Sequence, residues 1–140
     1  MTKKITLFFA LVLVMLAFGC KKDEIADNKD RLLGQWELTN LVQIEYLNDR
    51  ETDRSEDRDD DLVFDFAANG GGRVLYGSEN ETALTWVLAE DHLTMKFDGE
   101  TYLFSIRNLN NSEMTLVSEE TRNSSQGIKR DVMELYLRKR

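Results

Sequence analysis

Cysteine and proline are almost missing from this chain, whose 140 residues include one cysteine and no proline. A lone cysteine has no partner for an intrachain disulfide, so the stability of the fold must come from packing. The absence of proline, together with eight glycines, indicates a turn-rich chain without disordered linkers. A chain of this length forms one domain and can bury roughly two thirds of its unfolded surface, which is enough for one core.

Residues that commonly act in catalysis or bind metal ions are also scarce. His92 is the only histidine, and its place beside Asp91 in a tight turn is typical of a surface residue rather than a catalytic base. No nucleophile has a recognisable partner and no cluster of metal ligands is present, so we expect no enzyme, no metal site and no cofactor. Acids outnumber Lys and Arg by 26 to 18, which excludes nucleic acid as a partner.

One long apolar run lies at the N-terminus. Lys3 and Lys4 precede residues 5–18, which are apolar except for Thr6 and lead into Gly19 and Cys20. A helix of residues 5–18 reaches roughly 21 Å, which is shorter than the bilayer core of about 30 Å. We therefore predict a signal peptide over residues 1–19 rather than a membrane span.

Cys20 follows this run in a pattern that resembles a bacterial lipobox, in which the cysteine is acylated after the preceding peptide is removed. The alternatives are an unmodified thiol after ordinary cleavage and a cysteine in an uncleaved anchor. The prediction is a mature protein attached to the outer membrane by lipid at Cys20. The run Lys21-Lys22-Asp23-Glu24 resembles the export tag of surface-displayed lipoproteins of Bacteroidetes, although a solvated tether explains it as well. Residues 20–31 are expected to form this lipidated tether and a short helix that stops at Gly34.

The folded part begins with a long alternating segment. Trp36 and Leu38 share one parity of a first strand, and after an interruption the same parity continues through Val42, Ile44 and Tyr46. A period of two is typical of a strand with one buried face, so these five side chains are expected to face the core.

Turn residues separate the later strands. Asn69-Gly70 and Asp98-Gly99 are strong hairpin signals because both residues of each pair tolerate positive φ. Residues 118–127 are read as a polar loop. The expected strands are residues 35–47, 62–67, 73–76, 82–89, 93–98, 101–107, 114–117 and 132–138.

Eight short strands joined mostly by hairpins leave a sheet with two exposed edges unless the sheet closes on itself. The succession of tight turns favours pairing of neighbouring strands in order. We therefore predict an all-β fold, an eight-stranded antiparallel up-and-down barrel with a short N-terminal helix. A β-sandwich is the alternative.

Several segments in order carry a family resemblance. They are Leu32-Leu33-Gly34-Gln35-Trp36-Glu37-Leu38, Phe64-x-Phe66-x-x-Asn69-Gly70, Trp86-x-Leu88 with Leu93, Tyr102-x-x-x-Ile106-x-x-Leu109, and Met114-Thr115-Leu116. In order and spacing these segments resemble the lipocalin-like domain of Bacteroidetes lipoproteins, here over residues 32–140. The resemblance implies a calycin-type barrel whose floor contains Gly34 and Trp36. It also implies an arginine packed against Trp36, for which Arg138 is the nearest candidate and Arg140 the second.

Bulky inward residues allow two interpretations of the barrel interior. An eight-stranded barrel is just wide enough to be filled by its own side chains or to hold one small ligand. The residues expected to line such a pocket, or to fill it, are Leu38, Phe64, Phe66, Leu84, Trp86, Leu88, Met95, Phe97, Tyr102 and Phe104.

Residues 48–61 break the strand pattern. They contain the dipeptides Asp49-Arg50, Asp53-Arg54 and Asp57-Arg58 at a spacing of four, which fits a short charged helix or a disordered loop equally. In lipocalins this loop closes the open end, so the segment is a candidate lid. Its last part, Asp57-x-Asp59-x-Asp61, begins like a calcium loop but has Leu62 where the turn glycine belongs and Ala68 where the bidentate acid belongs, so a solvated acidic loop is the default.

Together these features predict a lipid-anchored, non-catalytic envelope protein that binds a small apolar ligand or a glycan in the barrel. The alternative is a solid-core surface protein that acts through contacts with other proteins and holds no ligand.

Overall fold

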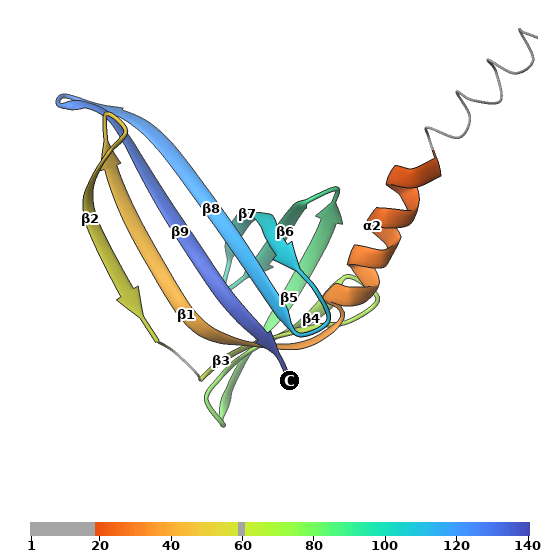
Figure 1. Ribbon diagram of the computed structural model, residues 1–140. Coiled ribbons are helices and arrows are strands. Elements are labelled where there is room, and N and C mark those ends of the chain that lie inside the picture. The colour runs from red at the N-terminus through yellow and green to blue at the C-terminus, as the bar shows by residue number, and fades with distance from the viewer. Residues whose placement is uncertain (1–18, 59–60) are drawn as a thin grey trace, which may run out of the picture.

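The computed structural model describes residues 19–58 and 61–140, with side chains from Ala26 onward. Within these ranges one helix precedes nine antiparallel strands that form a single sheet (Figure 1). No helix of the described ranges is both long enough and apolar enough to cross a membrane. Residues 1–18 of the predicted signal peptide lie outside the described residues. The elements are α2 (Gly19–Leu32), β1 (Gly34–Leu47), β2 (Arg50–Asp57), β3 (Leu62–Phe66), β4 (Gly71–Tyr76), β5 (Asn80–Ala89), β6 (His92–Phe97), β7 (Glu100–Leu109), β8 (Glu113–Ser124) and β9 (Gly127–Lys139).

Pairing of β1 with β9 closes the sheet into a barrel. The two strands run side by side from the pair Trp36 and Lys139 to the pair Leu47 and Lys129. From β3 to β9 each strand pairs with the next in the chain, and β3 returns to the start of β1. The predicted eight-stranded antiparallel barrel with a short helix is therefore confirmed, with β2 as a ninth strand outside the ring.

The acidic segment is neither a helix nor a disordered loop over most of its length, so that prediction is wrong. Residues Arg50–Asp57 form β2, which pairs with β1 from Leu41 to Leu47. The turn between the two strands is made by Asn48 and Asp49, both at positive φ. Every residue of β2 is exposed, so no apolar alternation could reveal the strand. Asp59 and Asp60 lie outside the described residues.

A second correction concerns the predicted loop at residues 118–127. There β8 continues to Ser124 and β9 starts at Gly127, so a long β8–β9 hairpin replaces the loop. The β8–β9 turn contacts the β1–β2 turn, because the side-chain oxygen of Asn48 accepts a hydrogen bond of 3.0 Å from the Ile128 amide. These hairpins extend the sheet beyond the shorter strands β3 to β7 (Figure 1).

A bulge at Thr39 reverses the two faces of β1. Leu38 lies opposite Leu137 but Asn40 lies opposite Tyr136, so one residue of β1 has no counterpart. Trp36 and Leu38 face the main core, whereas Val42 and Ile44 belong to a separate cluster on the other face. The expectation that all even-numbered apolar residues of this strand face one core is therefore wrong beyond Asn40.

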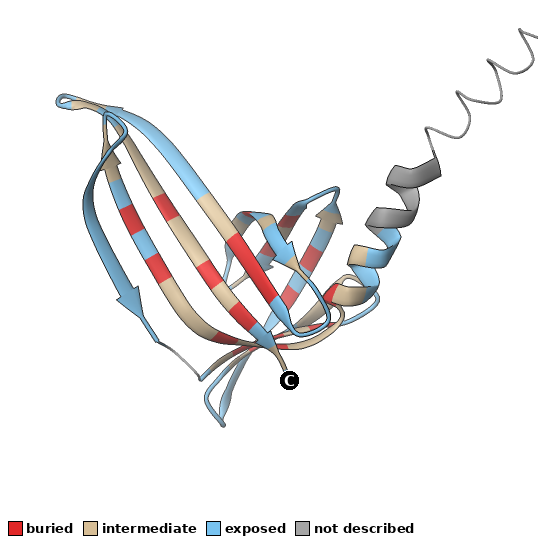
Figure 2. Ribbon diagram, viewed as in Figure 1, coloured by how far each residue is buried: buried red, intermediate tan, exposed pale blue. Residues whose placement is uncertain are grey.

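The main core fills the part of the barrel nearest the start of β1. Fifteen buried residues from the end of α2 and from strands around the ring form one cluster. Figure 2 shows these buried positions as bands on successive strands, while β2 is exposed from end to end. Leu32 at the end of α2 is fully buried, so the helix covers part of this core.

An outer cluster consists of Val42, Ile44 and Val132, and partly buried side chains that include Tyr136 pack against it. Tyr136 donates a hydrogen bond of 2.6 Å to Glu134, and Arg107 donates one of 2.7 Å to the other carboxylate oxygen. The hydrogen bond from Tyr136 is the main cause that lowers the pKa of Glu134, and Arg107 adds to it against the opposing effect of burial.

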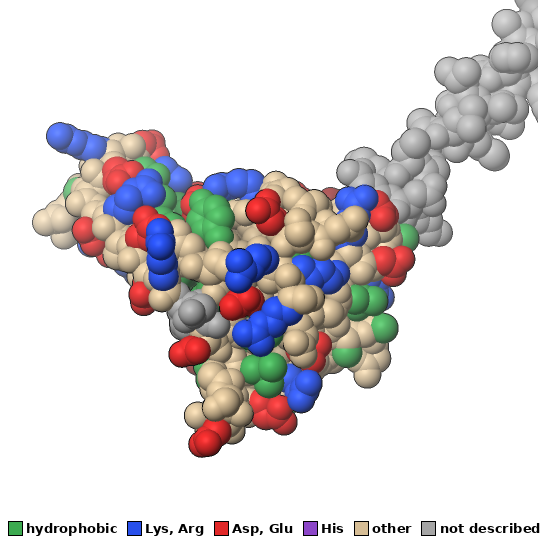
Figure 3. Space-filling model, turned by 60° about the horizontal axis from the view of Figure 1, so that its bottom comes forward, with side chains coloured by type: hydrophobic (Ala, Val, Ile, Leu, Met, Phe, Trp, Pro, Cys, Tyr) green, Lys and Arg blue, Asp and Glu red, His purple; other side chains and the backbone are tan. Residues whose placement is uncertain are grey.

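Acidic and basic side chains, some of them in ion pairs, cover the end of the molecule that lies at the bottom of Figure 1. In Figure 3 basic and acidic side chains intermingle on this face, with small scattered hydrophobic groups. Arg73, for example, contacts Asp65 at 3.0 Å and Glu81 at 3.1 Å. A mixed surface of this kind is typical of solvent contact and shows no basic patch.

Replacement of Gly72 by alanine should strongly destabilise the barrel. An added Cβ would collide with the backbone carbonyl oxygen of Asp65, which cannot move without breaking the β3–β4 pairing. We expect a loss of about 3 kcal/mol or more, measured by chemical denaturation. Gly77→Ala is the matched control because its Cβ would meet nothing within 4 Å, and it should cost only about 1 kcal/mol for its left-handed backbone. Equal losses in the two variants would contradict the close approach.

Glu134 should make stability depend on pH in the acid range. Because its pKa is lowered in the folded protein, its contribution is complete above the ordinary value of 4.5 and is lost as the pH falls through the lower folded value. The difference in unfolding free energy between the wild type and Glu134→Gln should therefore shrink below pH 4.5. Denaturation at a series of pH values, with exposed Glu100→Gln as the control, measures it. A difference that stays constant with pH would contradict the assignment.

Candidate functional site

The floor of the barrel is built around Trp36, whose side chain is fully buried. Its indole N–H donates a hydrogen bond of 2.8 Å to the carbonyl of Leu32 at the end of α2. The ammonium group of Lys139 lies 5.1 Å from the centre of the indole ring and donates a hydrogen bond of 2.9 Å to the carbonyl of Arg31. Two donors thus satisfy carbonyls that the helix end leaves without partners, which fixes the helix to the barrel.

Arg138 does not pack against Trp36, so the candidate that the resemblance suggested is wrong. Its side chain is largely exposed and contacts Glu37 at 3.3 Å. Arg140 contacts the same carboxylate at 3.7 Å. The β1–β9 register explains the difference, because Lys139 lies opposite Trp36 and Arg138 lies opposite Glu37 on the other face. Gly34 does lie at the floor, with positive φ at the point where the chain leaves α2.

The side chains predicted to line or fill the barrel all belong to the main core. Leu38, Phe64, Phe66, Leu84, Trp86, Met95 and Phe104 are buried, while Leu88, Phe97 and Tyr102 are partly buried against them. Their rings contact one another: Phe66 meets Trp86 edge-on at 5.8 Å, and Phe97 stacks on Tyr102 at 4.6 Å. This packing corresponds to the filled interior that the sequence left open. A ligand pocket among these residues stays a prediction and would require them to move apart.

Polarity rises along the inner face of the extended sheet, from the core to the hairpin tips. Leu41 on β1 lies level with core residues of β9 and β8. Two residues further along β1, Gln43 lies level with Met133 and Ser118. Two residues beyond that, the row consists of Glu45, Asp131 and Glu120, and β2 adds Asp53 to its end.

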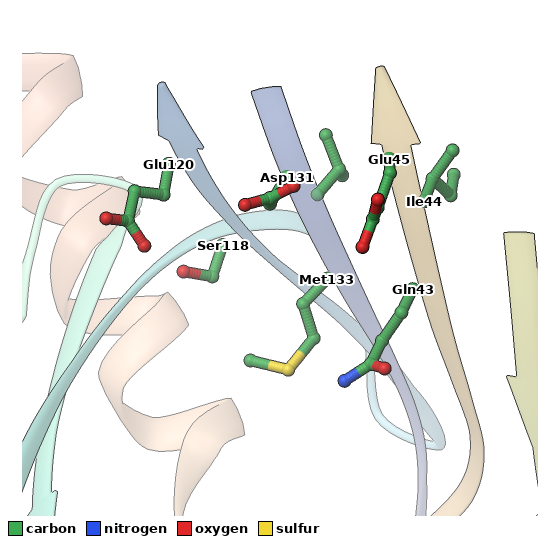
Figure 4. A pocket seen from close by; sticks show the side chains of 8 residues that line it. Gln43, Ile44, Glu45, Ser118, Glu120, Asp131 and Met133 are labelled. Atoms are coloured by element: carbon green, nitrogen blue, oxygen red, sulfur yellow. The ribbon is translucent and has the colours of Figure 1, made fainter. Parts of the chain in front are cut away.

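We call this region the mouth of the barrel, defined by Gln43, Glu45, Ser118, Glu120, Asp131 and Met133. These residues line a shallow pocket of about 290 Å³. Figure 4 shows their side chains extending from β1, β8 and β9, with Ile44 directed away from them. The mouth therefore offers carboxylate, amide and hydroxyl groups beside one methionine.

The acidic row at the mouth is only partly neutralised. Asp131 contacts Arg122 at 2.7 Å. Within the described part of the chain, Asp53, Glu45 and Glu120 form no ion pair. Carboxylates that face one another across neighbouring strands repel and destabilise the sheet. The row is therefore a polar site whose charge is left for solvent or a ligand to compensate.

The other residues considered in the sequence, His92, Cys20 and the possible metal ligands, form no catalytic or metal-binding arrangement among the described side chains. His92 is half exposed, and its Nδ1 lies 2.8 Å from Asp91. Residues 19–58 and 61–140 contain no group of acids, histidines or cysteines arranged to hold a metal ion. The backbone of Cys20 lies in α2, but its side chain is outside the described ones.

A closed antiparallel barrel that carries its tryptophan at the floor and a polar mouth at the other end is consistent with a lipocalin-like fold. The family model described as a lipocalin-like domain matches residues 32–116, which is more than half of the chain. The protein belongs to this family, whose members are generally binding proteins rather than enzymes. No match was found among curated proteins, and none was found among solved structures.

Sequence reasoning missed both Lys139 and the mouth. Lys139 differs from the predicted arginine by one position in the register. The acids of the mouth lie on three strands, and only cross-strand pairing brings them together. The dipeptide Asn48-Asp49 was the one available signal, because two residues that accept positive φ predict a tight turn and hence a paired strand after it.

Removal of the Lys139 side chain should loosen the floor. Lys139→Ala loses the hydrogen bond to Arg31 and the contact with the Trp36 ring, so we expect a loss of about 1–2 kcal/mol in unfolding free energy. Arg138→Ala removes an equally basic but exposed neighbour and should cost under about 0.5 kcal/mol. Chemical denaturation compares the two, and a larger loss in Arg138→Ala would contradict the floor described above.

Proposed function

We propose that this protein is a lipid-anchored, non-catalytic binding module that holds a hydroxyl-rich ligand, a glycan fragment, at the mouth of its barrel. The observation that carries the proposal is the uncompensated row of Asp53, Glu45 and Glu120 above a filled core. Natural sequences place such locally unfavourable arrangements at functional sites.

The chemistry of the mouth favours a glycan over an apolar ligand. Ionised carboxylates only accept hydrogen bonds, and sugar hydroxyls and amino groups donate them. Gln43 and Ser118 can donate as well as accept, and Met133 offers an apolar surface to the C–H groups of a sugar ring. An amino sugar fits best because its ammonium group would offset the negative charge of Glu45 and Glu120.

Attachment to the outer membrane is supported by the apolar run that precedes Cys20 and by the fact that no other cysteine exists. Two or three acyl chains would hold the protein firmly at a membrane surface. The Lys21-Lys22-Asp23-Glu24 run supports display on the cell surface, where a glycan ligand would be met.

A second candidate function is contact with another protein by a barrel that holds no ligand. It is favoured by the packing of the main core, in which aromatic side chains occupy the interior. Under this alternative the mouth would bind no small molecule.

Binding at the mouth should depend on its unpaired acids. Titration of the full-length protein in detergent with a deacetylated chitooligosaccharide should show saturable binding, weakened about tenfold in Glu45→Gln/Glu120→Gln, which equals about 1.4 kcal/mol. The same variant should be slightly more stable, because the like-charge row is relieved. Glu79→Gln/Glu100→Gln removes the same charge at exposed sites elsewhere and should change neither property.

The N-acetylated oligosaccharide and dodecanoate complete this titration. Weaker binding of the acetylated form is expected because it lacks the ammonium group. Binding of dodecanoate that is unchanged in the double variant would place the ligand inside the barrel and contradict a site at the mouth. No binding of any of the three would favour the protein-contact alternative.

Loss of the anchor should release the protein from the membrane. Cys20→Ala leaves no cysteine to acylate, so the variant should move from the detergent phase to the aqueous phase on Triton X-114 partitioning of cells. A variant that stays in the detergent phase, with the same mobility as the wild type, would contradict lipidation at Cys20.

A further inference from the structure

The sheet ends at an open edge formed by β2. Its inner edge pairs with β1, and in the described part of the chain no strand pairs with its outer edge. Figure 1 shows β2 at the margin of the molecule, and all its residues are exposed. Such an edge presents unpaired backbone N–H and C=O groups, which can accept a further strand.

Several of the usual protections of an edge are missing from β2. The strand has eight residues without a proline, and all eight are exposed. What remains is charge and a bulge at Thr52, where Glu45 lies opposite Asp53 and Tyr46 lies opposite Glu51. The charges therefore decide which strand can add to this edge.

A second copy of the same strand fits poorly. Antiparallel pairing of residues 53–57 with themselves must place side chains of the same face opposite one another. A register centred on Arg54 opposes two arginines. A register centred on Ser55 opposes Asp53 to Asp57 twice, and its two Arg54–Glu56 pairs on the other face compete with partners that both residues already have in Glu51 and Asn40. Registers centred on Asp53 or Glu56 oppose identical acids. Each of these pairings juxtaposes like charges, which destabilises a sheet.

The acids of β2 differ in how far they are already compensated. Glu51 forms an ion pair with Arg54 at 3.0 Å, and Glu56 accepts a hydrogen bond of 2.7 Å from the Asn40 amide. Asp53 and Asp57 lie on the inner face, opposite Glu45 and Leu41, and form no ion pair within the described residues. Two uncompensated carboxylates four residues apart therefore lie on one face of the open edge.

We propose that the outer edge of β2 binds an extended basic segment of another protein as an added antiparallel strand. Backbone hydrogen bonds to β2 supply affinity, as in other cases of strand addition. Selectivity comes from Lys or Arg at two positions four residues apart, which lie opposite Asp53 and Asp57. This interaction shares only Asp53 with the acidic row of the mouth, because Asp57 and the outer edge do not line that pocket.

The test uses the full-length protein in detergent and a fluorescent peptide of about nine residues, rich in Thr and Val, with two Lys four positions apart. Saturable binding by fluorescence anisotropy is expected, with slower amide hydrogen exchange in β2. Asp53→Asn/Asp57→Asn should weaken binding about tenfold without lowering the thermal unfolding temperature, because Asp53 no longer opposes Glu45, whereas Glu79→Gln/Glu100→Gln should not weaken binding. Glu45→Gln/Glu120→Gln should leave peptide binding within about twofold of the wild type, which separates this site from the mouth.

Two peptide controls complete the experiment. A peptide with Glu in place of both Lys should not bind. A peptide that keeps both Lys but is N-methylated at alternate backbone positions should lose binding, because strand addition needs its N–H groups. The proposal is overturned if the Lys peptide fails to bind, if the methylated peptide binds equally well, if protection appears away from β2, or if the protein alone dimerises through β2.

Discussion

The pairing of β1 with β9 is the constraint on which the rest of the structure depends. It turns a nine-stranded sheet into a closed ring with β2 outside it, so that β2 pairs with β1 alone. It also sets Lys139 opposite Trp36, so that one side chain from the last strand reaches both the buried indole and the end of α2. Closure of the barrel and attachment of the helix are therefore consequences of one register.

The bulge at Thr39 lets a single strand serve two purposes. Before it, β1 places Trp36 in the apolar core; beyond it, the same inner face carries Gln43 and Glu45. The apolar residues of the second half turn outward and pack with Val132 against Tyr46, Val117 and Tyr136. An extra residue thus allows the extended half of the sheet to be stabilised from outside while its inner face stays polar.

The sequence predicted the barrel, the helix and the turns because each has a local signal. Alternation reveals strands such as β5 and β6, and Asn69-Gly70 or Asp98-Gly99 fixes the hairpins. β2 could not be predicted, since all its residues are exposed and alternation carries no information there. The strand register decides which face Val42 lies on, whether Lys139 or Arg138 lies opposite Trp36, and which acids form the row at the mouth. A single bulge shifts this register, and the amino-acid composition does not encode it.

The two proposed interactions use residues that lie outside the clusters that stabilise the fold. Like charges aligned across strands weaken a sheet by a few tenths to about 1 kcal/mol for each pair, so the row at the mouth would be hazardous in a marginal element. Stability here comes from the core around Trp36 and from the outer cluster, and neither includes Glu45 or Glu120. The chain enters the barrel at the floor, and the hairpin tips lie at the opposite end of β1. Under the proposed anchoring, the part that holds the fold together is nearest the attachment point, and the part left uncompensated is the one that faces away from it.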